Sequence, residues 1–377
     1  MKTNWILIFT VLALVLFGFS EGEDHTRDTG CKDCVSFTLE ILNESSILVK
    51  SDSVTDFSVS FDNEYSNARP YIELLEPYHD SFAQTTLRAR NASYLIHFPI
   101  YWYKSLPYGV LTTKSGIVES TFLFPRTNTS KFSITSDTAI FISGIGRGKQ
   151  FEIKKADLEN SYIVFGNSDV RCSRSYGNIS VSIMSLDDFS WNNSYCDGVF
   201  SIVDYYSSEF GDRLQSNYTI TFSKARSYAS LPSGFFVNEY DLTFIAHELF
   251  HSWQPQNECM ENIFYKEGLA TYMAQYAQLR LGIITKDEFD LTLNDYRNRL
   301  FSIENISSLY FEHNLNELRK LDPQSHGLLM YAKGALLWDM IEKENNTNNI
   351  FFLSLDENQC DEISKLLSEH EQKIYGD

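Results

Sequence analysis

The chain has 377 residues and a net charge of −19, from 31 basic and 50 acidic residues. A surface this acidic repels phosphate backbones and anionic membrane faces, so the composition argues against nucleic-acid binding. The length favours two domains, and 28 Phe and 22 Tyr residues supply apolar surface for a full core in each.

Residues 1–20 have the pattern of an export signal. Lys2 gives a short basic start, Trp5 to Phe19 form an apolar run, and the small residue Ser20 follows it. The run is shorter than the roughly twenty residues that a membrane-spanning helix requires. We therefore expect a secreted or otherwise extracytoplasmic protein with no other membrane association. The alternative is an anchor formed by an uncleaved N-terminal segment.

Eight N-x-S/T sequons agree with export, because an exported chain can carry glycans on surface turns. The sequons begin at Asn43, Asn91, Asn128, Asn178, Asn192, Asn217, Asn305 and Asn345. The sequence thus predicts a glycoprotein.

Six cysteines, an even number, suit a disulfide framework. The C-x-x-C segment Cys31–Cys34 is not followed by a βαβ pattern, so a small structural bridge is expected there and not a redox centre. Proximity in the sequence pairs Cys172 with Cys196, which leaves Cys259 to pair with Cys360. No cysteine is needed as a metal ligand.

Residues 35 to about 185 have the pattern of β-strands. Short runs rich in β-branched and aromatic residues alternate with turns rich in Gly, Asn, Ser and Asp. The runs are Val35–Leu42, Phe57–Phe61, Ser93–Phe98, Tyr162–Phe165 and Ile179–Ile183. We predict a β-sandwich-like N-terminal domain over residues 21–185.

A second, mostly helical domain is predicted over residues 186–377, where helical periodicity replaces the alternating pattern. The expected elements are a helix at Phe200–Phe210, a strand at Tyr218–Phe222, and helices from the capping box Thr285–Glu288 to Leu300, at Ser325–Lys343 and at Asp361–Tyr375.

The segment Asp241–Trp253 reads DLTFIAHELFHSW and contains the motif H-E-x-x-H. Asp241 is a suitable N-cap, and no Gly or Pro interrupts the run, so a helix is expected. His247 and His251 then lie one turn apart on the same face, where both can bind one metal ion. Glu248 can take a proton from a water molecule on that ion.

A third ligand is predicted in the following helix, which contains Glu267 and ends at Gly282, a suitable C-cap. Apolar neighbours favour burial of the Glu267 carboxylate, and a buried carboxylate needs a partner. The alternative is an ordinary surface carboxylate. We predict one zinc ion per chain, bound by His247, His251 and Glu267, with the fourth position left for water.

The segments HELFHSW and KEGLATYMA resemble the glutamate-ligand zinc peptidases, the gluzincins. They are most similar to the glycyl-aminopeptidase family and, more distantly, to enzymes of the aminopeptidase N type. In those families a downstream Y-x-K-G motif supplies a tyrosine that stabilises the oxyanion, and Tyr331–Gly334 matches that motif. The resemblance covers roughly residues 195–345.

This resemblance implies an α+β fold, with a β domain ahead of a mostly helical, thermolysin-like zinc peptidase domain. It also implies peptide-bond hydrolysis with Glu248 as general base and Tyr331 as oxyanion donor. For Tyr331 the alternative is an ordinary core tyrosine.

Two features depart from the family pattern. The interval between His251 and Glu267 is shorter than is usual. The aminopeptidases also carry, upstream of the zinc helix, a glutamate that binds the free amine of the substrate, and the nearest segment here, Ser233–Phe236, has no acid. Exopeptidase and endopeptidase action therefore both stay open.

Two classes of function follow. The first is a secreted zinc metallopeptidase, aminopeptidase-like, that acts on a peptide or protein substrate. The second is a catalytically inactive gluzincin-like ectodomain that serves as a binding module. The second class would predict decay among the catalytic residues, whereas all five positions hold chemically suitable side chains, so the enzyme is the expected class.

Overall fold

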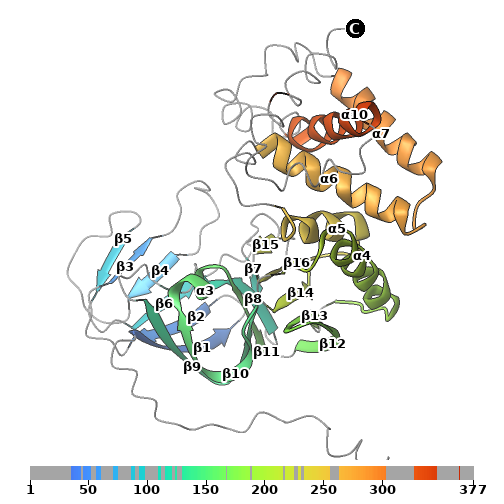
Figure 1. Ribbon diagram of the computed structural model, residues 1–377. Helices are drawn as coiled ribbons and strands as arrows, with labels where there is room; N and C mark the ends of the chain where they lie inside the picture. The colour runs from blue at the N-terminus through green and yellow to red at the C-terminus, as the bar shows by residue number, and fades with distance from the viewer. Residues whose placement is uncertain are drawn as a thin grey trace, which may run out of the picture.

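Figure 1 shows the computed structural model of the protein. The structure describes residues 35–43, 46–51, 57–60, 71–74, 86–89, 93–97, 109–111, 115–120, 124, 130–166, 168–186, 189–214, 217–224, 228–230, 233–254, 263–302, 327–345 and 365. The predicted export signal, the C-x-x-C bridge, the Cys259–Cys360 pair and nearly all of the predicted helix at Asp361–Tyr375 lie outside these residues.

The N-terminal half consists of β-strands, as the sequence predicts. Its large sheet has nine strands in the order β4-β6-β2-β1-β9-β11-β8-β7, with β10 paired to β9. These strands are β1 Val35–Asn43, β2 Ser46–Ser51, β4 Tyr71–Leu74, β6 Ser93–His97, β7 Gly109–Leu111, β8 Ser115–Glu119, β9 Lys131–Ile142, β10 Gly146–Lys154 and β11 Tyr162–Gly166. Strands β3 (Phe57–Ser60) and β5 (Thr86–Ala89) form a separate pair, and helix α3 (Lys155–Glu159) joins β10 to β11.

Alternating burial explains why these segments form strands. In β9 the side chains of Phe132, Ile134 and Ser136 are buried, and those between them are less so. The Phe132 ring lies 5.8 Å from the ring of Phe37 on the parallel neighbour β1. Aromatic residues thus pack together with aliphatic ones in the core of this sheet.

A second sheet has five strands in the order β12-β13-β14-β16-β15. Its strands are β12 Ser168–Tyr176, β13 Ile179–Leu186, β14 Tyr218–Phe222, β15 Tyr228–Ser230 and β16 Gly234–Val237. Strands β13, β14 and β16 are mutually parallel. The chain passes from one sheet to the other between Gly166 and Ser168, ahead of the predicted domain boundary at residue 185. The division into domains stays a prediction.

The five-stranded sheet is covered on both faces, which is why β14 and β16 are continuous buried runs. Ile183 and Phe235 face the helices, whereas their neighbours Met184 and Phe236 pack with Tyr162 against the nine-stranded sheet. The buried Tyr162 hydroxyl donates to the Thr219 carbonyl at 2.9 Å and also lies within hydrogen-bonding distance of Thr221 Oγ1 and the Phe235 carbonyl. One tyrosine of the first sheet therefore bonds to two strands of the second.

Replacing Tyr162 by phenylalanine should lower the free energy of unfolding by about 1–3 kcal/mol, since buried polar groups lose a partner. Tyr276→Phe is the control because the Tyr276 hydroxyl bonds to Arg280 in an exposed position. Its effect should stay within about 0.5 kcal/mol. Denaturant titrations of both variants measure the difference, and equal losses would contradict this role for Tyr162.

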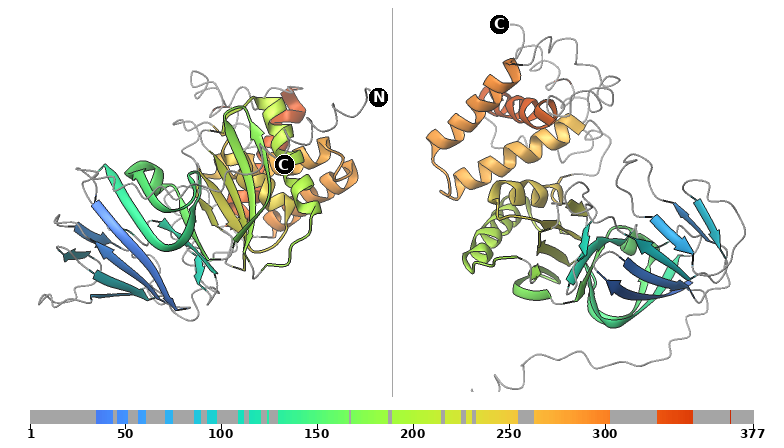
Figure 2. Two further views of the ribbon diagram at one scale, coloured as in Figure 1. Left: turned by 90° about the horizontal axis from the view of Figure 1, so that it is seen from below. Right: turned by 180° about the vertical axis from the view of Figure 1, so that it is seen from behind.

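The helices follow the second sheet. Their bounds are α4 Ser194–Phe210, α5 Leu242–His251, α6 Ile263–Arg280, α7 Lys286–Phe301 and α10 Gly334–Asn345. Helices α4 and α5 lie against the sheet, and α6 packs on α5 and on α10, away from the nine-stranded sheet (Figures 1 and 2). The predicted capping box of Thr285 and Glu288 is confirmed at the start of α7. None of the described helices combines the length and apolar character that crossing a membrane requires.

The predicted helix at Ser325–Lys343 differs from a regular α-helix. Residues Leu328–Lys333 form a π-helical segment, η5, and the α-helical geometry of α10 begins only at Gly334. The apolar periodicity that predicts a helix does not distinguish a five-residue hydrogen-bond step from a four-residue one. Segments of this kind are frequently found at functional sites.

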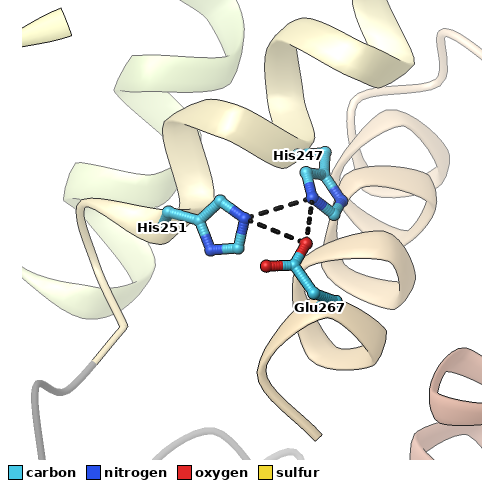
Figure 3. A group of neighbouring side chains, drawn as sticks. All are labelled: His247, His251 and Glu267. Atoms are coloured by element: carbon cyan, nitrogen blue, oxygen red, sulfur yellow. Dashed lines mark hydrogen bonds and ion pairs between the residues drawn. The ribbon is translucent and has the colours of Figure 1, made fainter. Parts of the chain in front are cut away.

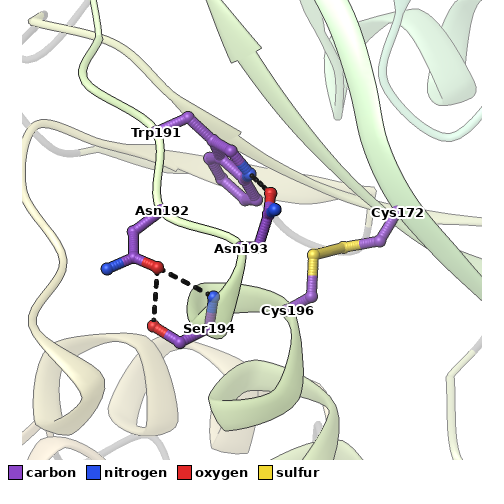
Figure 4. Close-up of a disulfide and its surroundings, with 6 residues drawn as sticks. All are labelled: Cys172, Trp191, Asn192, Asn193, Ser194 and Cys196. Carbon is purple, nitrogen blue, oxygen red and sulfur yellow. Dashed lines mark hydrogen bonds between the residues drawn. A yellow bond between two sulfur atoms is a disulfide. The ribbon is translucent and has the colours of Figure 1, made fainter.

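The predicted disulfide between Cys172 and Cys196 is confirmed (Figure 4). It joins β12 to the first turn of α4. Three of the sequon asparagines have exposed side chains, namely Asn178, Asn192 and Asn217. Asn192 also accepts hydrogen bonds from the backbone and hydroxyl of Ser194, which orders the turn in front of α4 (Figure 4).

Candidate metal centre

Helix α5 begins and is anchored as the sequence predicts. The Asp241 carboxylate accepts hydrogen bonds from the backbone N–H groups of Thr243 at 2.9 Å and Phe244 at 3.1 Å. Ile245 and Leu249 are fully buried in the core between α5 and the sheet. With its start and its apolar side both fixed, the helix holds the histidine face in one orientation.

Three ligand atoms meet between α5 and α6 (Figure 3). His247 Nε2 lies 3.1 Å from Glu267 Oε2 and 3.1 Å from His251 Nε2. His251 Nε2 lies 3.5 Å from Glu267 Oε2. The two imidazoles are buried and the carboxylate is partly buried. The structure therefore brings all three predicted ligands together.

Gln254 and Thr271 determine which imidazole nitrogens face this centre. The Gln254 amide donates to the Lys266 carbonyl at 2.7 Å, so its oxygen, 2.6 Å from His251 Nδ1, accepts the Nδ1 proton. The Thr271 hydroxyl donates to the Glu267 carbonyl at 2.8 Å, so its oxygen accepts from His247 Nδ1 at 3.3 Å. In its neutral form, which a metal ligand requires, each ring thus directs an unprotonated Nε2 at the centre.

This arrangement fits a metal ion. Two imidazole nitrogens and one carboxylate oxygen, all with lone pairs facing one point, repel one another unless a cation lies among them. They are also the donor types of catalytic zinc sites, which use three protein ligands and leave one position open. The residues present would therefore hold zinc.

The charge of the centre also favours a cation. Burial alone would raise the pKa of the Glu267 carboxyl, but its contacts with the His247 and His251 rings outweigh burial and hold this pKa well below its ordinary value. Glu267 therefore stays negatively charged at neutral pH.

Glu248 is next to these ligands but is not one of the three converging groups. Burial raises the pKa of its carboxyl, and the opposing influence of His247 and His251 is smaller. A carboxyl whose pKa is raised by burial takes up a proton more readily than an exposed one. Glu248 therefore lies beside the three converging groups and outside their set, and its role as base stays a prediction.

Tyr331, on η5, lies at the same centre. Its ring is 5.7 Å from the His247 ring, at an interplanar angle of 65°, and 42% of the residue is exposed. This exposure argues against the alternative of a core tyrosine. The structure thus gathers all five predicted site residues from α5, α6 and η5.

The sequence reasoning missed Gln254 and Thr271. Helical spacing could have indicated Thr271, since it lies one turn after Glu267 on the same face of α6. Gln254 lies three residues after His251, in the turn that follows α5, and this spacing could have indicated their contact.

Replacing Gln254 by leucine should weaken zinc binding about 10–100-fold, because His251 loses the acceptor that orients its ring. Gln278→Leu is the matched control: Gln278 is a buried glutamine of α6 that bonds to Thr243 on α5, away from the ligands. Competition with a chromophoric chelator measures both dissociation constants. Equal zinc affinities of the two variants would contradict a role for Gln254 in metal binding.

The chain is similar in fold to an aminopeptidase N family protein from Idiomarina loihiensis, with a TM-score of 0.59, 13% identity, and coverage of 91% of this chain and 71% of that chain. Yeast leukotriene A4 hydrolase in complex with bestatin has a TM-score of 0.49 and 13% identity, with coverage of 94% of this chain and 68% of that chain. An M1 zinc metallopeptidase from Deinococcus radiodurans has a TM-score of 0.48 and 11% identity, with coverage of 91% of this chain and 92% of that chain. No protein-family model and no curated protein sequence matches the chain. At 13% identity the first likeness establishes the fold, and the chemistry rests on the residues of the site.

Proposed function

We propose that this protein is a secreted zinc-dependent metallopeptidase that hydrolyses peptide bonds. The convergence of His247, His251 and Glu267, with Glu248 beside them and Tyr331 against His247, carries the proposal. The aminopeptidase N type of fold supports it. The more specific likeness to the glycyl-aminopeptidase family stays a prediction.

A bound zinc ion would polarise the carbonyl of the substrate and lower the pKa of a bound water molecule to about 7. His247, His251 and Glu267 would hold that ion, and Gln254 and Thr271 keep the imidazoles oriented towards it. Glu248 would accept a proton from the attacking water and deliver it to the leaving amine. The partial burial of this centre strengthens the charge interactions inside it.

Tyr331 would donate a hydrogen bond from its hydroxyl to the developing oxyanion of the substrate. A single oxyanion donor typically contributes about 3 kcal/mol to transition-state stabilisation. The exposure of Tyr331 leaves its ring on the side open to solvent, from which a peptide would enter.

Export, glycosylation and the cleaved signal belong to the same proposal. The Cys172–Cys196 disulfide supports it, because such bonds persist in oxidising compartments. The exposed sequon asparagines support it as well. Mass spectrometry of the mature protein should find an N-terminus near Ser20 and glycans at several sequons. An unglycosylated chain that retains residues 1–20 would contradict it.

The experiment that tests the activity uses the purified full chain on a mixed peptide library, with and without a chelator, and reads the product ends by mass spectrometry. Products that disappear with the chelator and return with zinc would support the peptidase. Product ends also separate removal of amino-terminal residues from internal cleavage. A chain that binds zinc and cleaves nothing would instead favour the binding module.

A further inference from the structure

Two glycines meet where α6 crosses the junction of η5 and α10. A Cβ atom added to Gly268 would lie 2.3 Å from Gly334 Cα, 2.5 Å from the Gly334 carbonyl carbon and 3.0 Å from the backbone nitrogen of Ala335. All three atoms belong to the backbone, so no side-chain rotation could relieve the overlap. Only glycine at position 268 permits this crossing.

Both glycines are directly connected to the candidate metal centre. Gly268 follows Glu267 in the chain, and the N–H of Gly334 donates to the carbonyl of Tyr331. Tyr331 in turn lies against the ring of His247. A displacement at the crossing would therefore move the tyrosine relative to the ligands.

Ordinary close packing does not explain glycine at both positions. Ala270, Ala274 and Ala277 on α6 and Ala335 on α10 are buried, so alanine is small enough for these helices elsewhere. Glycine in a helix interior destabilises the helix relative to alanine. Its presence on both sides of one contact indicates that the distance of approach itself matters.

We propose that the Gly268–Gly334 contact sets the distance between the metal-binding helix α6 and Tyr331, so that the two glycines are positioning residues for the reaction. The inference rests on the proposed function. Glycine at position 268 allows the start of α10 to contact the residue that follows Glu267. The hydrogen bond from Gly334 to the Tyr331 carbonyl then fixes the position of the tyrosine relative to that contact.

Gly268→Ala and Gly334→Ala test this inference, with Gly327→Ala as the matched control. Gly327 precedes η5, has a helical φ of −60°, and has open space where a Cβ would be added. Each alanine at the crossing should lower kcat about 100-fold with little change in KM, because a displacement of about 1 Å can cost that much. The control should retain wild-type kcat, and all three variants should retain zinc.

A double-mutant cycle separates positioning from general damage. If the contact acts through Tyr331, Gly334→Ala should cost less than about threefold when it is added to Tyr331→Phe. The same 100-fold loss in that background would overturn the inference. Saturating zinc in every assay stabilises the folded state by mass action. If neither alanine variant folds even then, the contact serves the fold as a whole and the positioning role is wrong.

Crystal structures of the alanine variants give a result that needs no turnover. The Tyr331 and His247 rings should separate beyond the present 5.7 Å, whereas Gly327→Ala should preserve that distance. If the wild-type protein is inactive but the rings separate in the variants, the proposed reaction is wrong, and the Gly268–Gly334 contact still determines the position of Tyr331. Unchanged ring positions in both alanine variants would show that the contact does not determine that position.

Discussion

Replacing Glu248 by glutamine should lower peptide hydrolysis about 10²–10⁴-fold and leave the fold and the bound zinc in place. Glutamine keeps the shape of the side chain but cannot accept a proton at neutral pH, and the three ligands are untouched. Steady-state kinetics together with metal analysis of the same preparation measure both effects.

Glu239→Gln is the control for this substitution, since Glu239 is an exposed carboxylate shortly before α5. It should behave as the wild type. Wild-type hydrolysis by Glu248→Gln on every peptide tested would end the enzyme proposal. An inactive Glu248→Gln beside a fully active Tyr331→Phe would keep the zinc hydrolase and remove only the tyrosine from the mechanism.

Replacing Glu267 by alanine should strip most of the zinc from the purified protein, from about one ion per chain to a small fraction. The variant loses the one carboxylate among the three described candidate ligands, which lies 3.1 Å from His247, and leaves the two imidazoles. Metal analysis after dialysis, with thermal melting to verify folding, gives the result.

Glu342→Ala controls for the loss of a partly buried acid. Burial raises the pKa of Glu342 too, and this residue lies on α10, away from the candidate ligands. Its zinc content should equal that of the wild type. Full occupancy in Glu267→Ala would exclude Glu267 as a ligand. Blocking thiols should not release zinc from the wild type, because no cysteine is among the described ligands.

Local patterns predicted the elements well where one physical signal dominates. The N-cap of Asp241, the capping box at Thr285 and the strand at Tyr218–Phe222 each follow from a few neighbouring residues, and each is present. The proximity of Cys172 and Cys196 in the chain likewise predicted their disulfide.

Features that depend on tertiary contacts could not be predicted in this way. The alternation of apolar and polar residues in β13 would suit either the nine-stranded or the five-stranded sheet. Its pairing with β14 assigns it to the five-stranded sheet. The approach of Gly268 to Gly334 depends on two helices that are distant in the sequence. The hydrogen bond from Gln254 to the Lys266 carbonyl likewise requires α6 to lie beside the end of α5.

All three candidate metal ligands lie on α5 and α6, whereas Tyr331 comes from a segment much later in the chain. Zinc would therefore link a short stretch of the chain to itself, and its binding energy should act on that stretch first. In hydrogen–deuterium exchange, adding zinc should slow the backbone amides of α5 and α6 more than those of the nine-stranded sheet. Metal loading would thus stabilise the α5–α6 pair against local opening more than it stabilises the nine-stranded sheet.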